Sequence, residues 1–463
     1  MTLIKSISGI RGTIGGKAGE GLSPLDVVKF TGSYAHFLKK EFSKEQLNIV
    51  VGRDARISGE MVNKLVCGSL MSMGCNVIDL GLSTTPTVEM EVVRQKADGG
   101  IIITASHNPM QWNALKLLNQ KGEFLSGSDG EQVLELAENM DFDFADVLKI
   151  GSYQFCEGAI ERHVKDILKL ALVDVEAIKN ANFRIAFDAV NSTGGMALNL
   201  LLKALDVKQI IPLYAEPTGI FPHNPEPLPE NLTEISKLVV KEKADLAFVV
   251  DPDVDRLAIV MENGEMFGEE YTLVAVADYI LSKTNGNTVS NLSSTFALRD
   301  VTEKYGSQYF ASAVGEVNVV EKMKEVNAVI GGEGNGGVIY PELHYGRDAL
   351  VGIALFLSHL AYEKCTCYEL RAKYPNYIIS KNKIELKPDT DVDAILEKIK
   401  EQYAHQPIND IDGVKIEFGK EWVHLRKSNT EPIIRIYSES KSAEKANELA
   451  CKIIQNIKAI MES

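Results

Sequence analysis

The sequence predicts a multidomain α/β protein that ends in an α+β domain. Its 463 residues are too many for one hydrophobic core, so roughly two to four domains are expected. Short apolar runs alternate with amphipathic helical patterns through most of the chain, which is typical of parallel α/β sheets. From about Tyr377, strand patterns follow one another across short turns, which predicts an antiparallel sheet.

Strand and helix patterns alternate in three successive rounds. The first predicts strands at Leu47–Val51, Asn76–Leu80 and Gly100–Thr104 and helices near Glu60–Met73 and Thr87–Arg94. The second predicts strands at Arg184–Phe187, Gln209–Leu213 and Leu246–Val250 and helices near Met196–Leu205 and Leu232–Glu242. The third predicts strands at Thr288–Leu292 and Ala328–Gly331 and helices near Tyr271–Ser282, Val317–Glu325 and Leu350–Glu363. Each round predicts one α/β domain.

The last stretch has a different order of elements. It predicts the strands Tyr377–Leu386, Val414–Phe418, Trp422–Arg426 and Ile433–Ser438 and the helices Val392–Tyr403 and Ala443–Met461. The expected domains are residues 1–155, 156–258, 259–372 and 373–463.

The composition is that of an ordinary globular protein, with 45% hydrophobic and 24% charged residues. A formal net charge of −15 repels polyanions, which argues against nucleic acid or an anionic membrane as a partner. An anionic small-molecule substrate would need arginines and lysines concentrated at one place. The six cysteines form no CxxC pair, the N-terminus has no apolar run of signal-peptide length, and Leu350–Ala361 is too short to span a bilayer. We therefore expect reduced thiols and a cytoplasmic location.

Four polar loops carry the candidate chemistry, and the first is Thr104-Ala-Ser-His-Asn-Pro109. The Asn108-Pro109 pair forces a turn that holds Ser106 at the end of a strand, where a helix start could present amides to an anion. A helix cap is the commoner role for such a serine. A hydrolase elbow is disfavoured because the G-x-S-x-G frame is missing, and the adjacent His107 need not reach the serine hydroxyl.

The second loop, Asp251-Pro-Asp-Val-Asp-Arg256, follows the apolar strand pattern Leu246–Val250. Carboxylates at every second position can converge on one hard cation, and oxygen-only ligands favour magnesium over zinc. A calcium EF-hand would need glycine where Arg256 stands and would not lie between strands. A haloacid-dehalogenase phosphatase would use one carboxylate as its nucleophile, but its fifth loop position is threonine or valine rather than Asp255.

The third loop, Gly332-Glu-Gly-Asn-Gly-Gly337, satisfies the dinucleotide pattern G-x-G-x-x-G. That pattern requires a helix directly afterwards, which Pro341 and Gly346 prevent. A loop that offers Glu333 and Asn335 to sugar hydroxyls is favoured, with a plain tight turn as the alternative.

The fourth loop, Arg426-Lys-Ser-Asn-Thr-Glu-Pro432, lies between two strands of the last domain and is followed by Arg435. Two arginines, a lysine and two hydroxyls around a turn predict a phosphate clamp, because guanidinium groups bind phosphate in a bidentate manner and exposed amides add donors. Taken alone, a charged surface hairpin is an equal alternative. The other three loops favour the clamp.

In order along the chain, these loops resemble the serine, metal, sugar and phosphate loops of the α-D-phosphohexomutase superfamily. The resemblance also includes Gly9-Ile-Arg-Gly12, Gly52-Arg-Asp54 and the segment Thr218–Pro229, and it covers nearly the whole chain. It implies three related, doubly wound α/β domains and a smaller α+β domain around one central cleft. It also implies an isomerase of carbohydrate metabolism, an intramolecular phosphotransferase that works as a phosphoprotein.

The resemblance assigns roles to individual residues. Ser106 would carry the phosphoryl group, Arg11 and Lys116 would stabilise it during transfer, and His107 is a further catalytic candidate. One Mg²⁺ would be bound by phosphorylated Ser106 together with Asp251, Asp253 and Asp255. The phosphosugar would be bound by Glu333, Asn335, Arg256, Arg426, Ser428, Asn429, Thr430 and Arg435. A sugar bisphosphate would be the intermediate and the activator.

The sugar loop departs from the form Gly-Glu-x-Ser-Gly-His that many relatives carry. Asn335 stands at the serine position and Gly337 at the histidine position, so a candidate proton carrier is missing. We expect Lys116, or a residue outside the sugar loop, to handle the proton; burial and a nearby Arg11 would favour the lowered pKa that a lysine base needs. The variant resembles the phosphoglucosamine mutase type common in archaea, which predicts interconversion of glucosamine 6-phosphate and glucosamine 1-phosphate.

Three alternatives remain open at this point. Mannose or glucose phosphates are the alternative substrates of a mutase. A phosphatase would place the phosphoryl group on Asp251 and release phosphate, and a sugar-phosphate binding protein would never turn over. An assay with a sugar 6-phosphate and a trace of bisphosphate separates a mutase from a phosphatase and from a binding protein.

Overall fold

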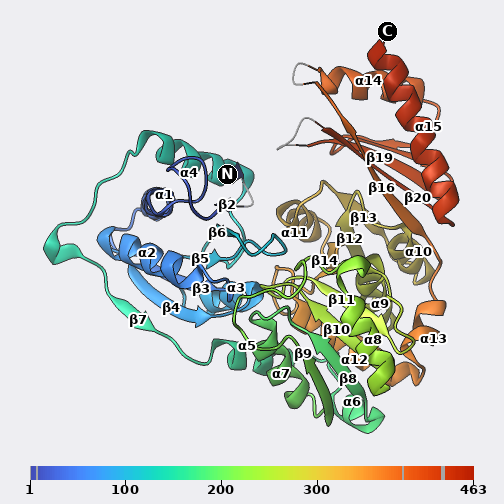
Figure 1. Ribbon diagram of the computed structural model, residues 1–463, viewed down its shortest axis with the longest axis horizontal. Helices are drawn as coiled ribbons and strands as arrows, with labels where there is room; N and C mark the ends of the chain where they lie inside the picture. The colour runs from blue at the N-terminus through green and yellow to red at the C-terminus, as the bar shows by residue number, and fades with distance from the viewer. Residues whose placement is uncertain (1, 7–8, 388–389, 429–432, 463) are drawn as a thin grey trace. The chain divides into compact units, whose positions relative to one another are not determined.

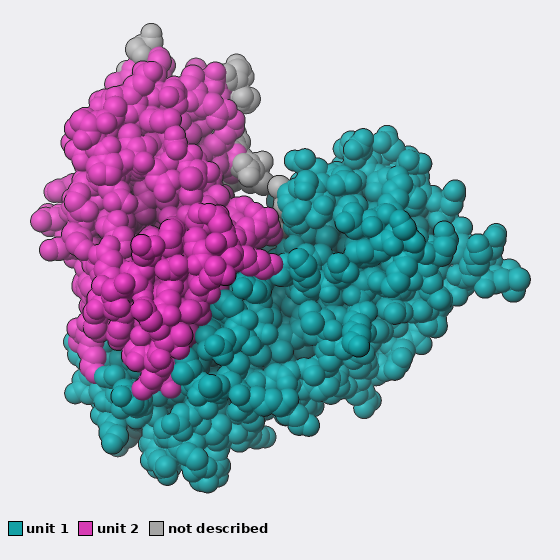
Figure 2. All heavy atoms as spheres, turned by 180° about the vertical axis from the view of Figure 1, so that it is seen from behind, with its two compact units in different colours: residues 1–276, 335–371 teal, residues 277–334, 372–463 magenta. Residues whose placement is uncertain are grey.

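The computed structural model describes the chain except residues 1, 7–8, 388–389, 429–432 and 463. The chain forms two compact units, which are residues 1–276 with 335–371 and residues 277–334 with 372–463 (Figure 2). Each unit is assembled from two separate stretches of chain. The boundaries of the four expected domains stay predictions.

The first unit begins with a sheet whose described strands follow the order β1-β2-β6-β5-β3-β4-β7 (Figure 1). These strands are β1 (Leu3–Ser6), β2 (Gly9–Thr13), β3 (Asn48–Arg53), β4 (Asn76–Leu82), β5 (Gly99–Ile103), β6 (Trp112–Leu118) and β7 (Tyr153–Phe155). Strands β5, β3, β4 and β7 run parallel as predicted, but β1, β2, β6 and β5 pair antiparallel. The loop 104–111 between β5 and β6 is too short for a crossover, so these two strands must pair antiparallel.

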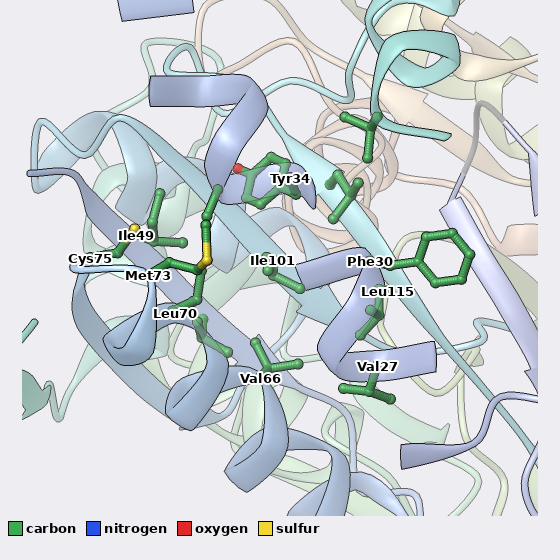
Figure 3. Close-up of a cluster of buried hydrophobic side chains, with 14 of the residues drawn as sticks. Val27, Phe30, Tyr34, Ile49, Val66, Leu70, Met73, Cys75, Ile101 and Leu115 are labelled. Carbon is green, nitrogen blue, oxygen red and sulfur yellow. The ribbon is translucent and has the colours of Figure 1, made fainter. Parts of the chain in front are cut away.

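Helices cover both faces of this sheet. The helices α1 (Pro24–Phe42), α2 (Gly59–Ser72) and α4 (Gly127–Asn139) share one core, and α3 (Thr85–Arg94) packs into another. Ser23 caps the start of the first helix, and its hydroxyl and amide exchange hydrogen bonds with Asp26 in a capping box. Figure 3 shows how side chains of α1 and α2 meet those of the strands; the labelled residues are Val27, Phe30, Tyr34, Ile49, Val66, Leu70, Met73, Cys75, Ile101 and Leu115. This packing gives β5 and β6 a rigid base.

The second sheet of this unit has the order β11-β10-β8-β9. Its strands are β8 (Arg184–Asp188), β9 (Gln209–Leu213), β10 (Leu246–Val250) and β11 (Leu257–Met261). Strands β9, β8 and β10 are parallel, whereas β11 returns antiparallel to β10 across the loop 251–256. Every residue of β10 is buried, as its unbroken apolar run predicts.

The first unit also contains further helices and one more strand. They are α5 (Ala159–Ile167), α6 (Val175–Ala181), α7 (Gly194–Ala204), α8 (Thr233–Glu242), β15 (Gly337–Ile339) and α12 (Ala349–Glu363), with short 3₁₀ turns at Val147–Lys149 and Pro229–Asn231. The helices α9 (Glu269–Lys283) and α13 (Cys367–Ala372) each contain a boundary between the units.

The second unit combines a parallel sheet with an antiparallel one. In the first, β12 (Asn287–Asn291) runs parallel to β13 (Tyr309–Ser312) and β14 (Ala328–Glu333), with α10 (Phe296–Lys304) and α11 (Glu316–Glu325) beside them. The C-terminal sheet has the order β16-β20-β19-β18-β17. Its elements are β16 (Ile378–Glu385), α14 (Val392–Gln402), β17 (Ile408–Asn409), β18 (Val414–Phe418), β19 (Glu421–Lys427), β20 (Ile433–Ser440) and α15 (Ala443–Glu462). These sheets confirm the predicted α/β class with an α+β ending.

The cysteines are free, as the sequence predicts. Burial raises the pKa of the thiols of Cys67, Cys75 and Cys367, so these three stay protonated. Over the described ranges, no helix combines the length and the apolar character that crossing a bilayer requires.

A buried histidine pair connects α3, α5 and α12 within the first unit. His163 Nε2 lies 2.9 Å from Asp348 Oδ2, and its Nδ1 lies 2.9 Å from the hydroxyl of Thr87. His344 Nε2 lies 3.4 Å from the same Asp348 oxygen, and its Nδ1 lies 3.3 Å from Glu89 Oε2. The two histidines and Asp348 are close enough to hold a metal ion, but every ring nitrogen already has a protein partner. Hydrogen bonds and ion pairs with protein groups therefore explain this cluster without a metal ion.

The charge of His344 makes stability depend on pH. Burial by itself would lower the pKa of His344, but hydrogen bonds to Asp348 and Glu89 raise it to about 10. Because the unfolded value is about 6.5, the stabilisation is fully present below that pH and is lost as the pH rises through about 10. We expect His344→Gln to lower the melting temperature most at pH 6 and progressively less towards pH 10.

Thermal unfolding of the wild type and the variant at both pH values measures this difference. The matched control is His405→Gln at an exposed histidine, which should change the melting temperature little at either pH. A deficit of the His344 variant that is the same at pH 6 and pH 10 would contradict the assignment.

Candidate active site

Ser106 lies in the turn that joins β5 to β6. The expected helix start is wrong, because the Asn108-Pro109 turn returns the chain directly to the sheet. Ser106 adopts a φ of 49°, and its amide donates to the hydroxyl of Thr104 at 2.9 Å. Its own hydroxyl donates to Asp251 Oδ2 at 2.7 Å and lies 3.3 Å from Nδ1 of His107. The adjacent histidine therefore does reach the serine.

The three aspartates of the loop between β10 and β11 are buried and gather their carboxylates at one place. One oxygen of each lies within 4.8 Å of the others, so the group could hold an ion. Asp251 Oδ1 accepts from the amides of Asp255 and Arg256, each at 3.2 Å. Among the described residues, Oδ1 of Asp253 and Oδ1 of Asp255 are buried and accept no hydrogen bond. Two such oxygens beside Ser106 fit the oxygen-only ligand set of a divalent cation.

Repulsion between these carboxylates supports the same conclusion. Burial and then the charges of Asp255 and Asp253 raise the pKa of Asp251 well above its usual value. Despite its burial, Asp253 keeps a pKa below the usual value, because Lys116 and the hydroxyl of Thr85 bind its ionised form. A cation among the three carboxylates would relieve the repulsion that Asp251 experiences.

Two basic side chains already compensate part of this charge. Lys116, on β6, donates to Asp253 Oδ2 at 2.7 Å and to Asp255 Oδ2 at 3.4 Å. Arg347 donates to Asp255 Oδ2 at 2.6 Å. Burial alone would lower the pKa of Lys116, but the two carboxylates raise it above its usual value. The expected lowering of this pKa is therefore wrong, and Lys116 stays protonated.

Arg11, on β2, and Arg256 add two further cations. Burial and then repulsion from Arg256 lower the pKa of Arg11. The same two causes lower the pKa of His107 to about 2, so the imidazole beside the serine is neutral. Together with Lys116 and Arg347, the two arginines make four cationic side chains around the three aspartates, and one of the four, Arg256, also pairs with Glu226 at 3.6 Å. Several cationic side chains beside a serine hydroxyl suit a phosphoryl group.

The sugar loop joins β14 to β15, and α12 begins only at Ala349, so no helix follows the glycines directly, as predicted. Glu333 is buried at the end of β14 in the second unit. Its Oε1 accepts from Asn291 Nδ2 at 2.9 Å and from the amide of Gly315 at 3.3 Å. Asn335 belongs to the first unit, and its side-chain oxygen accepts from the amide of Gly337 at 3.2 Å. The two expected sugar contacts therefore belong to different units.

The phosphate loop is the hairpin between β19 and β20. Arg426 and Arg435 are register partners across these strands, which places both guanidinium groups on one face of the sheet. The amide of Ser428 donates to the carbonyl of Ile433 at 3.1 Å and closes the hairpin. The predicted residues Asn429 and Thr430 lie outside the described residues.

Sequence reasoning missed two residues that contact the aspartates. The Thr85 hydroxyl, at the start of α3, donates to Asp253 Oδ2 at 2.6 Å, and its amide donates to the Asp253 carbonyl at 2.9 Å. The second is Arg347. The triplet Gly346-Arg-Asp348 repeats the Gly-Arg-Asp of residues 52–54, and this was the available signal for it. Thr85 has no such signal, because only packing brings α3 to the aspartate loop.

Sequence comparison matches four consecutive stretches of the chain to the domains of one family. Residues 3–144, 161–264 and 268–377 match alpha/beta/alpha domains I, II and III of phosphoglucomutase/phosphomannomutase, and residues 381–455 match its C-terminal domain. The chain belongs to the phosphoglucomutase/phosphomannomutase family. The superfamily resemblance of the four loops is thereby confirmed.

Relatives within the family align over almost the whole chain. The phosphoglucomutase/phosphomannomutase of Thermococcus kodakarensis is 37% identical and covers 94% of this chain and 96% of its own. The phosphoglucosamine/phosphogalactosamine mutase of Sulfurisphaera tokodaii is 33% identical and covers 98% of each chain. The fold is similar to the crystal structure of a family protein from Burkholderia thailandensis, with a TM-score of 0.85 at 23% identity over 99% of this chain and 98% of that one.

Family membership identifies the chain as a phosphohexomutase, an enzyme of the isomerase class. Its relatives act on small phosphosugars. Family members use a metal, and in this chain the buried aspartate triad could hold it.

Proposed function

We propose that this phosphohexomutase carries the phosphoryl group on Ser106 and interconverts glucosamine 6-phosphate and glucosamine 1-phosphate through a sugar bisphosphate. The observation that carries the proposal is the 2.7 Å hydrogen bond from the Ser106 hydroxyl to Asp251, at a site with several cationic side chains. A phosphoserine there would add about −1.5 to −2 charges. Phosphoryl transfer depends mainly on charge neutralisation and positioning, which the side chains around Ser106 can supply.

The proposed reaction moves one phosphoryl group out and another back. The bond from phosphorus to the Ser106 oxygen breaks while a bond to the free hydroxyl of the sugar monophosphate forms, and the bisphosphate results. After the intermediate turns over, its other phosphate returns to Ser106. Arg11 and Lys116 stabilise the transferring group. A trace of the bisphosphate activates the enzyme by phosphorylating Ser106.

Few side chains can carry the proton that moves during the proposed reaction. Gly337 has no side chain to carry it, and the neutral His107 has a pKa of about 2. Lys116 is protonated, so it can give a proton to the serine oxygen as that oxygen leaves. The proton of the sugar hydroxyl then passes to a residue outside the sugar loop.

One Mg²⁺ is the proposed metal, held by Asp251, Asp253, Asp255 and an oxygen of phosphorylated Ser106. The unshared oxygens of Asp253 and Asp255 support this assignment, because Mg²⁺ prefers hard oxygen ligands. When bound, the ion neutralises charge on the phosphoryl group.

Recognition of the sugar phosphate is assigned to other loops. The sugar hydroxyls would be bound by Glu333 and Asn335, with Arg256 as a further substrate contact. The phosphate that does not react would be bound by Arg426, Ser428, Asn429, Thr430 and Arg435. The pairing of Arg426 with Arg435 supports the clamp, since two adjacent guanidinium groups suit one dianion.

The preference for glucosamine rests on the sugar loop. The side chain of Glu333, at the end of β14, accepts hydrogen bonds from two neutral donors, the Asn291 side chain and the Gly315 amide. It could also pair with an ammonium at C2 of the sugar. The activity in the name of the Sulfurisphaera tokodaii relative supports this substrate. Glucose or mannose phosphates are the second candidate, which the Thermococcus kodakarensis relative favours. We place the enzyme in the cytoplasm, where its free thiols would stay reduced.

Phosphorylation of Ser106 is the first prediction. Active enzyme should carry one phosphoryl group there, found by intact mass and peptide analysis, and Ser106→Ala should abolish turnover. Ser128→Ala, at an exposed serine of the same unit, should keep wild-type kcat. A phosphoryl group released by neutral hydroxylamine would indicate an acyl phosphate on Asp251 and overturn the assignment.

Magnesium dependence is the second prediction. Chelation should stop turnover and added Mg²⁺ should restore it, and Mg²⁺ should raise the melting temperature of the wild type. Asp253→Asn should remove both responses, because it removes a ligand charge. Asp245→Asn is the matched control, since Asp245 accepts a hydrogen bond from the Arg184 amide at the start of β8 and its loss should leave both responses intact. Full activity of the wild type in chelator would exclude the metal.

Substrate preference is the third prediction. An ammonium–carboxylate contact is worth about 1–3 kcal/mol, so kcat/KM for glucosamine 1-phosphate should exceed that for glucose 1-phosphate by roughly tenfold to a hundredfold. Glu333→Gln should remove most of that preference while keeping activity on glucose 1-phosphate. The measurement is kcat/KM for the 1-phosphates of glucosamine, glucose and mannose. A higher value for glucose or mannose than for glucosamine would refute the substrate and leave the mutase intact.

A further inference from the structure

The turn between β3 and α2, residues 54–58, has no part in the proposed function. It follows directly on the Gly52-Arg-Asp54 triplet. Arg56 in this turn is 1% exposed, which is unusual for an arginine that forms no part of the phosphate or metal contacts. A buried guanidinium group must find partners for its donors, and the identity of those partners indicates what it does.

All the donors of Arg56 are used, and most of them go to the serine loop. Its Nη2 donates to the carbonyls of Ser106 at 2.5 Å and Asn108 at 2.7 Å. Its Nη1 donates to the carbonyls of Pro109 at 2.7 Å and Trp112 at 3.0 Å. Four carbonyls of one turn therefore converge on one guanidinium group, whose planar fork fixes their relative positions.

Asp54 also holds the serine loop, through Thr104 and through Arg56. Its Oδ2 accepts from Arg56 Nε at 3.0 Å and from the hydroxyl of Thr104 at 2.7 Å. The Thr104 oxygen in turn accepts from the amide of Ser106 at 2.9 Å. The Asp54–Arg56 pair thus holds Ser106 at two points. Arg56 binds its carbonyl directly, and Asp54 holds its amide through Thr104.

Ser106 needs such restraint because its φ of 49° lies in the left-handed region. A non-glycine residue there costs of the order of 1–3 kcal/mol and keeps that conformation only when its surroundings impose it. The conformation matters because it accompanies the 2.7 Å contact between the serine hydroxyl and Asp251.

The other side of the turn contacts the second sheet of the same unit. The Ala55 amide donates to Ser192 Oγ at 3.3 Å, and Ser192 Oγ donates to the carbonyl of Pro252 at 2.7 Å, inside the aspartate loop. The ring of Phe221 lies 5.1 Å from the Arg56 guanidinium carbon. A Cβ on Gly219 would lie 2.0 Å from the Ala55 carbonyl oxygen, so only glycine permits this approach. The turn therefore contacts the serine loop directly and the aspartate loop through Ser192.

We propose that Arg56, supported by Asp54, is a positioning residue that holds the serine loop so that the Ser106 oxygen stays at the aspartate triad. This inference rests on the proposed role of Ser106. Lysine cannot replace Arg56, because a single ammonium group cannot donate to four carbonyls spread around a turn.

The test is Arg56→Lys in the full-length enzyme. A displacement of the nucleophile by about 1 Å costs roughly a hundredfold in rate, so kcat should fall by about that factor. KM for the sugar phosphate should change less than about threefold, because the assigned sugar and phosphate contacts lie in other loops. Hydrogen exchange of the amides in residues 104–108 should become faster.

The matched control is Arg162→Lys. Arg162 on α5 also donates several hydrogen bonds, to Glu91 at 2.9 and 3.0 Å and to the Glu157 carbonyl at 2.7 Å, but it touches neither loop. It should lower the melting temperature while kcat and exchange in residues 104–108 stay at wild-type values. If Arg56→Lys does not fold, Thr104→Val removes the link between Asp54 and the Ser106 amide and should show the same pattern in kcat and exchange.

Two outcomes would overturn the proposal. The first is a kcat for Arg56→Lys that matches Arg162→Lys at equal folded fraction. The second is unchanged exchange in residues 104–108. Failure of the proposed function can be distinguished from failure of this inference, because it would show as turnover by Ser106→Ala. Hydrogen exchange in the serine loop reports on Arg56 whichever residue carries the phosphoryl group.

Discussion

Three aspartate carboxylates share one small buried space, and much of the first unit is arranged to keep them there. Each buried charge requires a partner or a ligand. Lys116 reaches the triad from β6, Arg347 from the segment before α12, and Thr85 from the start of α3. Elements from distant parts of the sequence are therefore held around one loop by the need to compensate its charge. The oxygens of Asp253 and Asp255 that remain without a hydrogen bond are those on which an ion would act.

The serine loop meets this triad because β5 and β6 form a tight antiparallel pair. A helix after β5 would have directed the chain over the face of the sheet, whereas the turn keeps Ser106 at the edge where the aspartates lie. At this edge His107 is neutral and Lys116 is protonated, so the two side chains contribute differently to the local charge. His107 adds no charge beside Ser106, and Lys116 supplies a cation to any group that would arrive there with negative charge.

The chemistry and the recognition are distributed differently over the chain. The described groups that would transfer the phosphoryl group belong to the first unit, whereas the proposed substrate contacts are shared: Arg256 and Asn335 belong to the first unit and Glu333, Arg426 and Arg435 to the second. Proposed substrate contacts in the second unit could change while the proposed reaction centre in the first unit stays the same. This agrees with the range of sugars in the names of relatives that are 37% and 33% identical to this chain.

The sequence by itself determined the fold class, most strands and helices, and the four loops that carry the candidate site. These depend on local pattern: the apolar run of β10 predicts a buried strand, and the alternating aspartates after it predict an ion site whatever surrounds them. The antiparallel return of β6, the raised pKa of Lys116 and the partners of the aspartates were decided by tertiary structure. Thr85 and Asp253 are 168 residues apart, and Ser106 and Asp251 are 145 apart. No local pattern encodes such contacts, because they exist only once packing brings the two sheets of the first unit together.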